Sequence, residues 1–167
     1  ATHGAPTAQN AHPHATDRVA LVHNGIIENF KELRAELQAD GRTLESDTDS
    51  EVVVHLVSRE IENGSSPREA VAQVLPRLRG AFALAIAFRD HPGMMIGARR
   101  GSPLVVGYGD GETYIGSDAL ALAPLTQQIS YLEEGDWVVV SREAAEIHDA
   151  ENQPVEREIQ TSGASAA

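Results

Sequence analysis

The segment AFALAIAF, residues 81–88, constrains the fold more than any other part of the chain. Its four large apolar side chains alternate with four alanines. Because successive side chains of a strand point to opposite faces, the pattern predicts a strand with a bulky face in a core and a small face close to another layer. A strand covered on both faces favours a layered domain.

Helical periodicity precedes this strand in three stretches, residues 29–41, 48–64 and 66–78. Each stretch begins with the spacing of a helix cap, namely Asn29 with Glu32, Thr48 with Glu51, and Ser66 with Glu69. Pro76 lies inside the third stretch and removes a hydrogen bond, so we expect a bend or an early end there.

Short strands are expected on both sides of the helices. RVALV, residues 18–22, predicts a strand that ends in a tight turn at His23-Asn24-Gly25, because Asn and Gly tolerate a positive φ. Six further strands are expected around MMIGA, PLVVGYG, ETYIGS, ISYL, WVVV and AEIH, with turns at residues 91–93, 110–111 and 134–135. SDALALAPL predicts a short helix capped by Ser117 or Asp118 and stopped at Pro124. The order of elements indicates an α+β fold with helices packed on sheet.

Size and composition indicate one domain. The chain has 167 residues, of which 41% are hydrophobic, enough for a substantial core. We assign residues 1–160 to the domain and residues 161–167, TSGASAA, to a linker or disordered tail, since this tail is small, polar and without periodicity.

The net charge of −12 argues against nucleic acid and anionic membrane surfaces as partners. No run approaches the roughly 20 apolar residues of a membrane span, and the first residues lack the features of a signal peptide, so we expect a cytoplasmic protein. The chain contains no cysteine, which excludes disulfides, thiolate metal sites and a cysteine nucleophile within it.

Two stretches offer groups for acyl chemistry. In VHNGIIEN, the Asn24 amide and the backbone N–H of Gly25 could converge as an oxyanion hole, although a plain turn explains the same residues. In ESDTDSE, acidic residues complement the positive end of a helix dipole. Asp47 and Asp49 cannot both be caps, so one of them is available to receive a substrate ammonium group.

Two other stretches are weaker candidates for ligand binding, one for a metal ion and one for phosphate. His3, His12 and His14 lie near one another in the sequence, but a proline separates two of them and no acidic ligand lies nearby. We therefore expect no metal site, and we expect these histidines to bond backbone or substrate. RRGSPLVVG is basic and glycine-containing, which suits phosphate, but it lacks the spacing of a phosphate-binding loop.

Six motifs occur together in the order of one known family: ATHGAPTAQNAHPH, VHNGIIENF with KELR, SDTDSEVVVHL, LRGAFALAI, RRGSPLVVG and YLEEGD. In this they resemble the glutaminase domains of glucosamine-6-phosphate synthases, over roughly residues 1–160. HNG and TDSEV occur across the class II glutamine amidotransferases, whereas ATHG with NAHPH, NGIIEN and GSPLVVG is typical of the narrower glucosamine-6-phosphate synthase group. The resemblance implies an N-terminal nucleophile hydrolase fold, in which two antiparallel sheets stack face to face with helices outside.

The resemblance also implies roles for particular residues. Asn24 and Gly25 match the oxyanion hole, and Asp49 matches the carboxylate that receives the α-ammonium group of glutamine. Thr2 and His3 match residues of the pocket for the substrate α-carboxylate, and His12 lies in the same neighbourhood. In this family an N-terminal cysteine attacks the glutamine amide and releases ammonia, without a cofactor.

The family nucleophile lies some seventy residues before ATHG, and an arginine that clamps the substrate should fall just before Ala1. We therefore expect an N-terminally incomplete glutaminase domain that is inactive by itself. Its parent would be a glutamine:fructose-6-phosphate aminotransferase with an isomerase domain, assembled as a homo-oligomer. The alternatives are another class II amidotransferase, for instance amidophosphoribosyltransferase, or a non-catalytic module that binds an amino acid or a partner.

Overall fold

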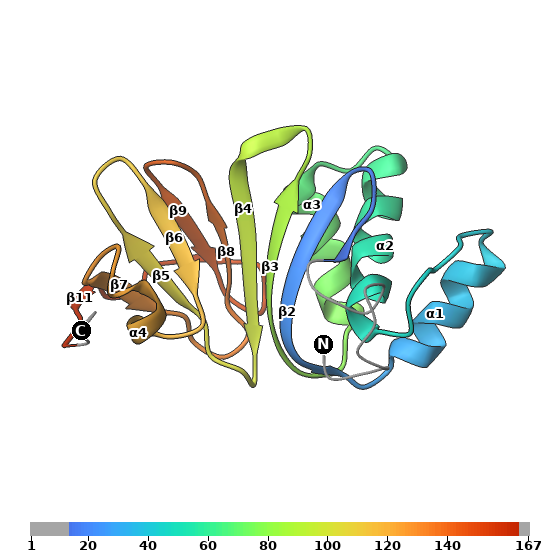
Figure 1. The fold of residues 1–167 in the computed structure, drawn as a ribbon, viewed down its shortest axis with the longest axis horizontal. Coiled ribbons are helices and arrows are strands. Elements are labelled where there is room, and N and C mark those ends of the chain that lie inside the picture. Colours follow the sequence, from blue (N-terminus) through green and yellow to red (C-terminus); the bar gives the residue numbers. More distant parts are fainter. Residues whose placement is uncertain (1–13, 164–167) are drawn as a thin grey trace.

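Two antiparallel sheets and four α-helices make up the computed structural model, which describes residues 14–163. In Figure 1 the larger sheet runs through the molecule, the smaller one lies at the left end, and α1–α3 cover the larger sheet at the right. The α+β class and the two-sheet architecture are confirmed.

The larger sheet has seven strands in the order β1-β2-β3-β4-β8-β9-β10. Their bounds are β1 His14–Ala15, β2 Val19–Ile27, β3 Gly80–Phe88, β4 His91–Arg100, β8 Trp137–Val140, β9 Ala145–His148 and β10 Pro154–Val155. The smaller sheet has the order β11-β7-β5-β6. Its strands are β5 Val105–Tyr108, β6 Thr113–Gly116, β7 Gln128–Tyr131 and β11 Gln160–Thr161.

Helices α1–α3 are amphipathic and contribute one face to the core on the larger sheet, whereas Leu122 of α4 packs on the smaller sheet. Their bounds are α1 Phe30–Ala39, α2 Asp49–Glu62, α3 Pro67–Val74 and the short α4 Ala119–Leu122. The third helix ends at Val74 and continues as a single 3₁₀ turn, η2 Leu75–Arg77, so the early end expected from Pro76 is confirmed.

The alternation in β3 organises both cores. Leu84 and Ile86 are buried in the core shared with the helices, whereas Ala83 packs in a second core between the two sheets. The small face is covered only in part, because Ala81 is exposed and Ala87 is half-buried. The second sheet therefore does not extend over the whole of this face.

The remaining strand and turn predictions are mostly confirmed. All six strands expected after β3 are present, and α4 is capped by Asp118, whose Oδ1 accepts the N–H of Ala121 at 2.8 Å. Gly111 (φ +70°) lies in the connection between β5 and β6, and Gly135 (φ +84°) lies in the turn before β8.

Two predicted turns are wrong. β2 continues through His23-Asn24-Gly25 and pairs with β3 up to Ile27. β4 begins at His91, and the chain reverses at residues 89–90 instead. In both cases pairing with a long neighbouring strand overrides a local turn signal.

Asn29 and Thr48 lie at the expected N-cap positions of α1 and α2, but the expected cap bonds of their side chains do not form. The Asn29 side chain makes no cap bond, because its amide donates to Arg77 O at 2.8 Å and its oxygen accepts from Arg79 N at 3.0 Å. Thr48 makes no side-chain cap bond either. Only the capping box of Ser66 and Glu69 forms as expected.

The C-terminal strands were not anticipated. Arg157 reaches the buried Asp136 with two hydrogen bonds, of 2.8 and 2.9 Å, and this pair ties the last segment to the start of β8. Thr161 lies in β11, and the Ser162 N–H donates to Gln127 O at 2.6 Å. Ordered structure therefore extends past residue 160.

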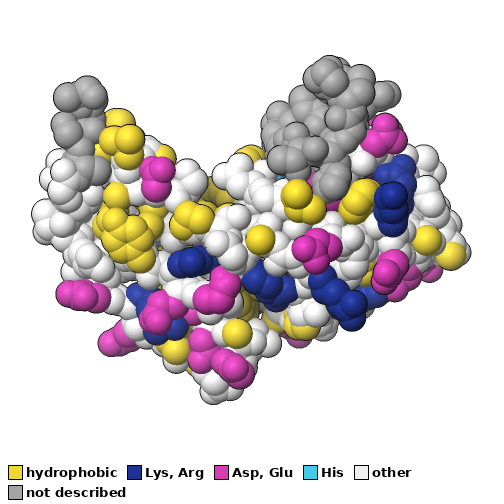
Figure 2. All heavy atoms as spheres, turned by 90° about the horizontal axis from the view of Figure 1, so that it is seen from below, with side chains coloured by type: hydrophobic (Ala, Val, Ile, Leu, Met, Phe, Trp, Pro, Cys, Tyr) yellow, Lys and Arg dark blue, Asp and Glu magenta, His cyan; other side chains and the backbone are white. Residues whose placement is uncertain are grey.

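The surface carries both signs of charge. Figure 2 shows acidic and basic side chains interspersed over one face, without a large patch of one sign. Within residues 14–163, no helix has the length and apolar character needed to cross a bilayer.

Candidate functional site

Gly25 lies near the end of β2, where this strand comes very close to β3. Its φ is +99°, and a Cβ atom added to it would lie 2.1 Å from the carbonyl oxygen of Ala81. The positive φ interrupts regular strand geometry, and a side chain has no room. Close backbone packing therefore requires glycine at this position. The strand continues through Asn24-Gly25, a dipeptide that is typical of turns.

Asp49 is the first residue of α2 and faces the same part of β2. Its side chain is 0% exposed, and its Oδ2 accepts a 2.8 Å hydrogen bond from the backbone N–H of Ile27. A buried carboxylate needs such partners, because an isolated charge is costly to remove from water. The N-terminal end of the helix adds a favourable dipole.

His23 and Ser50 complete this contact between strand and helix. The Nδ1 atom of His23 lies 2.8 Å from Ser50 Oγ and 3.7 Å from Asp49 Oδ1. Neither residue was identified from the sequence as a site candidate. The alternation of β2 could have indicated His23, because it falls on the same inward face as Val19 and Leu21.

Asn24 shares the segment but points the other way. It is exposed, whereas its neighbour His23 is buried, as strand alternation requires. β1 pairs only with Ala20 and Leu21, so no strand within residues 14–163 covers the outer edge of β2 beyond them. The exposed Asn24 side chain therefore lies on a stretch of β2 with no strand pairing at its outer edge among these residues.

The structure brings some of the candidate residues together. Asp49 and the backbone of the Asn24-Gly25 segment are neighbours, and their roles stay predictions. Thr2, His3 and His12 lie outside the described residues. Asp47 is exposed, one residue before the N-cap of α2.

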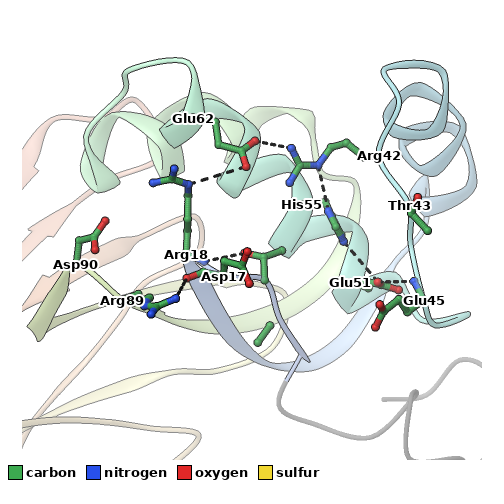
Figure 3. A pocket seen from close by; sticks show the side chains of 12 residues that line it. Asp17, Arg18, Arg42, Thr43, Glu45, Glu51, His55, Glu62, Arg89 and Asp90 are labelled. Carbon is green, nitrogen blue, oxygen red and sulfur yellow. Dashed lines mark hydrogen bonds and ion pairs between the residues drawn. The ribbon is translucent and has the colours of Figure 1, made fainter.

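A charged cavity of about 790 Å³ lies beside α2, on the side of Glu51. Figure 3 shows arginines and carboxylates from several elements around it. Glu62 pairs with both Arg42 (2.5 Å) and Arg18 (3.9 Å), so these cations are already engaged. The mixed and paired charges favour no particular ligand.

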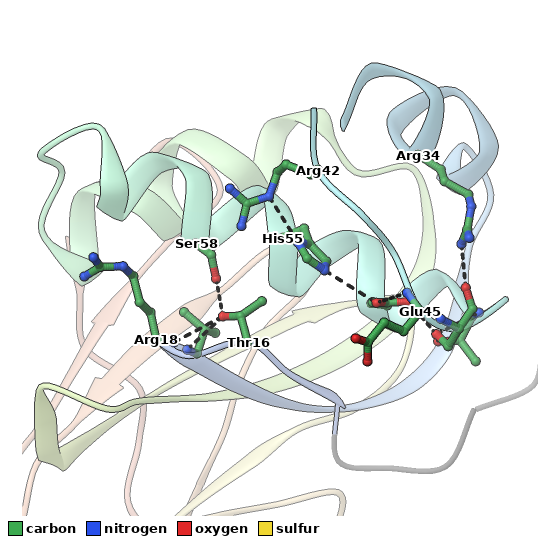
Figure 4. A network of polar contacts seen from close by, with 11 residues as sticks. Thr16, Arg18, Arg34, Arg42, Glu45, His55 and Ser58 are labelled. Carbon is green, nitrogen blue, oxygen red and sulfur yellow. Dashed lines mark hydrogen bonds and ion pairs between the residues drawn. The ribbon is translucent and has the colours of Figure 1, made fainter. Parts of the chain in front are cut away.

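A polar chain connects this cavity to the first turn of α2 (Figure 4). Arg42 Nε donates to Nδ1 of His55 at 3.1 Å, and His55 Nε2 lies 3.5 Å from Glu51 Oε2. Burial and the neighbouring Arg42 guanidinium lower the pKa of His55. A neutral ring with its proton on Nε2 fits both contacts.

Glu51 closes the loop that precedes α2. It accepts hydrogen bonds from Glu45 N (2.7 Å), Ser46 N (2.6 Å) and Ser46 Oγ (2.7 Å). Burial would raise the pKa of this carboxyl, but these donors outweigh burial and hold the pKa below its ordinary value. Glu51 therefore fixes the loop that leads to Asp49.

The stretch considered for phosphate, RRGSPLVVG, has internal partners. Arg99 donates to Leu132 O at 2.6 Å, Arg100 donates to Leu75 O at 3.2 Å, and the N–H of Gly101 donates to the Glu134 carboxylate. These donors of RRGSPLVVG hold the protein together and are not aimed at a phosphate. The part of the chain that the structure describes has no group of three potential metal ligands.

Comparison with known families gives a match over most of the chain. A family model described as a glutamine amidotransferase domain matches residues 5–124. This range contains Asn24, Gly25 and Asp49, as well as His23 and Ser50.

Among curated proteins, the chain is 66% identical over 165 residues to the glutamine–fructose-6-phosphate aminotransferase (isomerizing) of Zymomonas mobilis. It is 60% identical over 162 residues to the protein of the same name from Brucella suis. The matches cover 99% and 97% of this chain but only 27% of each relative. The chain therefore spans about a quarter of the length of these relatives.

Solved structures agree in fold. A phosphoribosylpyrophosphate amidotransferase from B. subtilis superposes with a TM-score of 0.73 at 24% identity, over 89% of this chain and 33% of that chain. A structure described as the allosteric regulatory enzyme of purine biosynthesis gives a TM-score of 0.69 at 25% identity, over 85% of this chain and 31% of that one.

Proposed function

The chain belongs to the glutamine amidotransferase domain family, and from this premise we propose that it forms the glutamine-binding part of a glutamine-hydrolysing site. One observation carries the proposal. The buried Asp49 carboxylate at the start of α2 is tied to β2 two residues beyond Gly25. This arrangement sets an anionic group beside a segment that offers amide N–H donors.

Each group has a distinct part in the proposed reaction. Asp49 pairs with the α-ammonium group of glutamine, which fixes the substrate at one end. The Asn24 amide and the Gly25 N–H stabilise the negative charge that develops on the amide oxygen when that carbon becomes tetrahedral. Thr2 and His3 are assigned to the substrate α-carboxylate and His12 to their surroundings, on sequence grounds alone.

Access to Asp49 requires a local opening, because its side chain is fully buried in the structure. A substrate ammonium group would then enter a poorly hydrated place. Electrostatic attraction is stronger there than in water, so a single carboxylate suffices for strong discrimination.

The covalent step needs a nucleophile that this chain does not supply. Glutamine amide cleavage through a thioester requires a cysteine thiolate, and the chain has no cysteine. We therefore propose that the 167-residue chain alone does not hydrolyse glutamine. The complete protein that the gene encodes would supply the thiolate.

For the complete protein we propose ammonia transfer from glutamine to fructose 6-phosphate, which forms glucosamine 6-phosphate. The 66% identity to an aminotransferase of that name supports this acceptor. The proposal includes an isomerase domain, assembly as a homo-oligomer and a cytoplasmic location.

The test is an acceptor assay on the complete protein with glutamine as nitrogen donor. We expect glutamate release to be matched by glucosamine 6-phosphate when fructose 6-phosphate is supplied, and no amine product from phosphoribosyl pyrophosphate. Amine formed only from phosphoribosyl pyrophosphate would assign the protein to the other acceptor. No glutamate release with any acceptor would favour a non-catalytic binding module and contradict the proposal.

A further inference from the structure

His23 is a polar side chain in an apolar setting. Its side chain is 1% exposed, and Leu21 and Ile27 on the same inward face of β2 are fully buried. A buried imidazole is costly unless its nitrogens find partners. Its Nδ1 faces Ser50 Oγ at 2.8 Å, with Asp49 Oδ1 at 3.7 Å.

This contact joins β2 to the first turn of α2. A second such contact is the 2.8 Å hydrogen bond from Ile27 N to Asp49 Oδ2. His23 and Ile27 lie on either side of the Asn24-Gly25 segment, two residues from Gly25 in each direction. The segment with the amide donors is thus held at both ends against consecutive residues of α2.

We propose that His23 is a positioning residue for glutamine binding. Through Ser50 it fixes the first turn of α2 on β2, and so sets the separation between the Asp49 carboxylate and the Asn24-Gly25 donors. The inference rests on the proposed function of Asp49 and adds the residue pair that holds it in place.

The expected effect follows from this geometry. Without the His23 contact, the first turn of α2 loses its hydrogen bond through Ser50 to β2, and Asp49 can shift relative to the Asn24-Gly25 segment. Displacements near 1 Å at a reacting group can cost about 100-fold in rate. Glutamine binding should therefore weaken while acceptor binding does not.

The experiment measures KM for glutamine and for the acceptor in the complete protein, together with the unfolding midpoint. His23→Leu removes the ring nitrogens and keeps apolar volume. We expect KM for glutamine to rise at least about tenfold, which is less than the roughly 100-fold rate loss that a 1 Å displacement can cause. His23→Asn places an amide near the position of Nδ1 and should restore most of the affinity. Ser50→Ala should resemble His23→Leu.

Ser58→Ala is the matched control. Ser58 is also buried on α2, but its Oγ bonds to Thr16 Oγ1 at 2.5 Å, away from Asp49. It should lower stability without changing KM for glutamine. If His23→Leu does not fold, His23→Asn and Ser50→Ala still carry the test.

Unchanged KM for glutamine in His23→Leu or Ser50→Ala would overturn the inference, as would an equal increase in Ser58→Ala. An equal rise in KM for the acceptor would also overturn it, because it would indicate general disruption. These results leave the proposed function intact. Absence of glutamine hydrolysis in the unaltered protein contradicts the proposed function and removes the basis of this inference as well.

Discussion

Gly25 occupies a place in β2 that no other residue fits. Its φ of +99° excludes most side chains, and a Cβ would lie 2.1 Å from the Ala81 carbonyl oxygen and 2.8 Å from the Phe82 Cα atom. All of these are backbone atoms of β3, which cannot move away independently. Close approach of the two strands is therefore built into the sheet at the candidate site.

Replacement of Gly25 by alanine should cost more than the strain of its φ angle alone. We expect Gly25→Ala to lower the free energy of unfolding by more than about 4 kcal/mol, a range that single substitutions reach only by severe local disruption. Gly64 has a similar φ of +102° with nothing within 4 Å, so Gly64→Ala should cost only about 1–2 kcal/mol. Urea titrations of both variants measure the two losses of unfolding free energy. Equal losses would contradict this account, because they would show that the strands separate easily enough to admit a Cβ atom at residue 25.

The sequence identified Asn24, Gly25 and Asp49 as candidates but not His23 or Ser50. The first three occur in short motifs whose chemistry can be read locally. The contact between His23 and Ser50 joins residues 27 positions apart, and it depends on how α2 lies on β2. Periodicity shows which face of a helix is buried, but not which buried side chains meet.

Helices α1, α2 and α3 begin in different ways, although the spacing of their cap residues is alike. Three stretches have the spacing of a helix cap, but only Ser66 and Glu69 form the reciprocal bonds. Glu51 bonds the preceding loop instead, and Asn29 bonds the segment before β3. Tertiary partners thus take over donors and acceptors that an isolated helix would use for its own end.

Removal of the one intact capping box should destabilise the protein modestly. We expect Ser66→Ala to lower the free energy of unfolding by about 1 kcal/mol, because Glu69 N loses its acceptor. The hydroxyl of the neighbouring Ser65 donates to the exposed Gln73 side chain and does not cap the helix, so Ser65→Ala should stay within about 0.5 kcal/mol. Chemical denaturation distinguishes the two, and a larger loss at Ser65 would contradict the assignment of the cap.

Strands were easier to predict than their ends. The alternation in residues 81–88 correctly indicated β3 and its two unequal faces, whereas the extension of β2 through His23-Asn24-Gly25 was missed. β2 is long because β3 is long, and pairing along the whole of β3 supplies hydrogen bonds that a turn at Asn24-Gly25 would forfeit. β10 and β11 have only two residues each, too few for any pattern.

Across the molecule, ionisable groups make the helical layer sensitive to acid. Glu36 of α1 pairs with Arg77 and Arg59, and mainly the hydrogen bonds from these two lower the pKa of Glu36 from 4.5 to about 2. His55 and Glu51 also have lowered pKa values. All three groups favour the deprotonated form in the folded protein.

Stability should therefore decrease as pH falls. The contribution of His55 is complete above its ordinary pKa of 6.5 and is lost as pH decreases below it. The contribution of Glu36 is present above 4.5 and is lost as pH falls toward 2. Denaturant midpoints between pH 7.5 and 4 should decline monotonically. His55→Gln should flatten the decline between pH 7 and 5. A rise in stability on acidification would contradict this assignment.

The central claim is that Asp49 holds the ammonium group of glutamine, and KM for glutamine in the complete protein tests it most directly. Asp49→Asn keeps size and an acceptor for Ile27 N–H while removing the charge, so KM should rise at least about 30-fold, the equivalent of about 2 kcal/mol for loss of a desolvated charge pair. Asp47→Asn, at an exposed carboxylate two residues earlier, should leave KM unchanged. An unchanged KM in Asp49→Asn, or an equal rise in both variants, would contradict the claim.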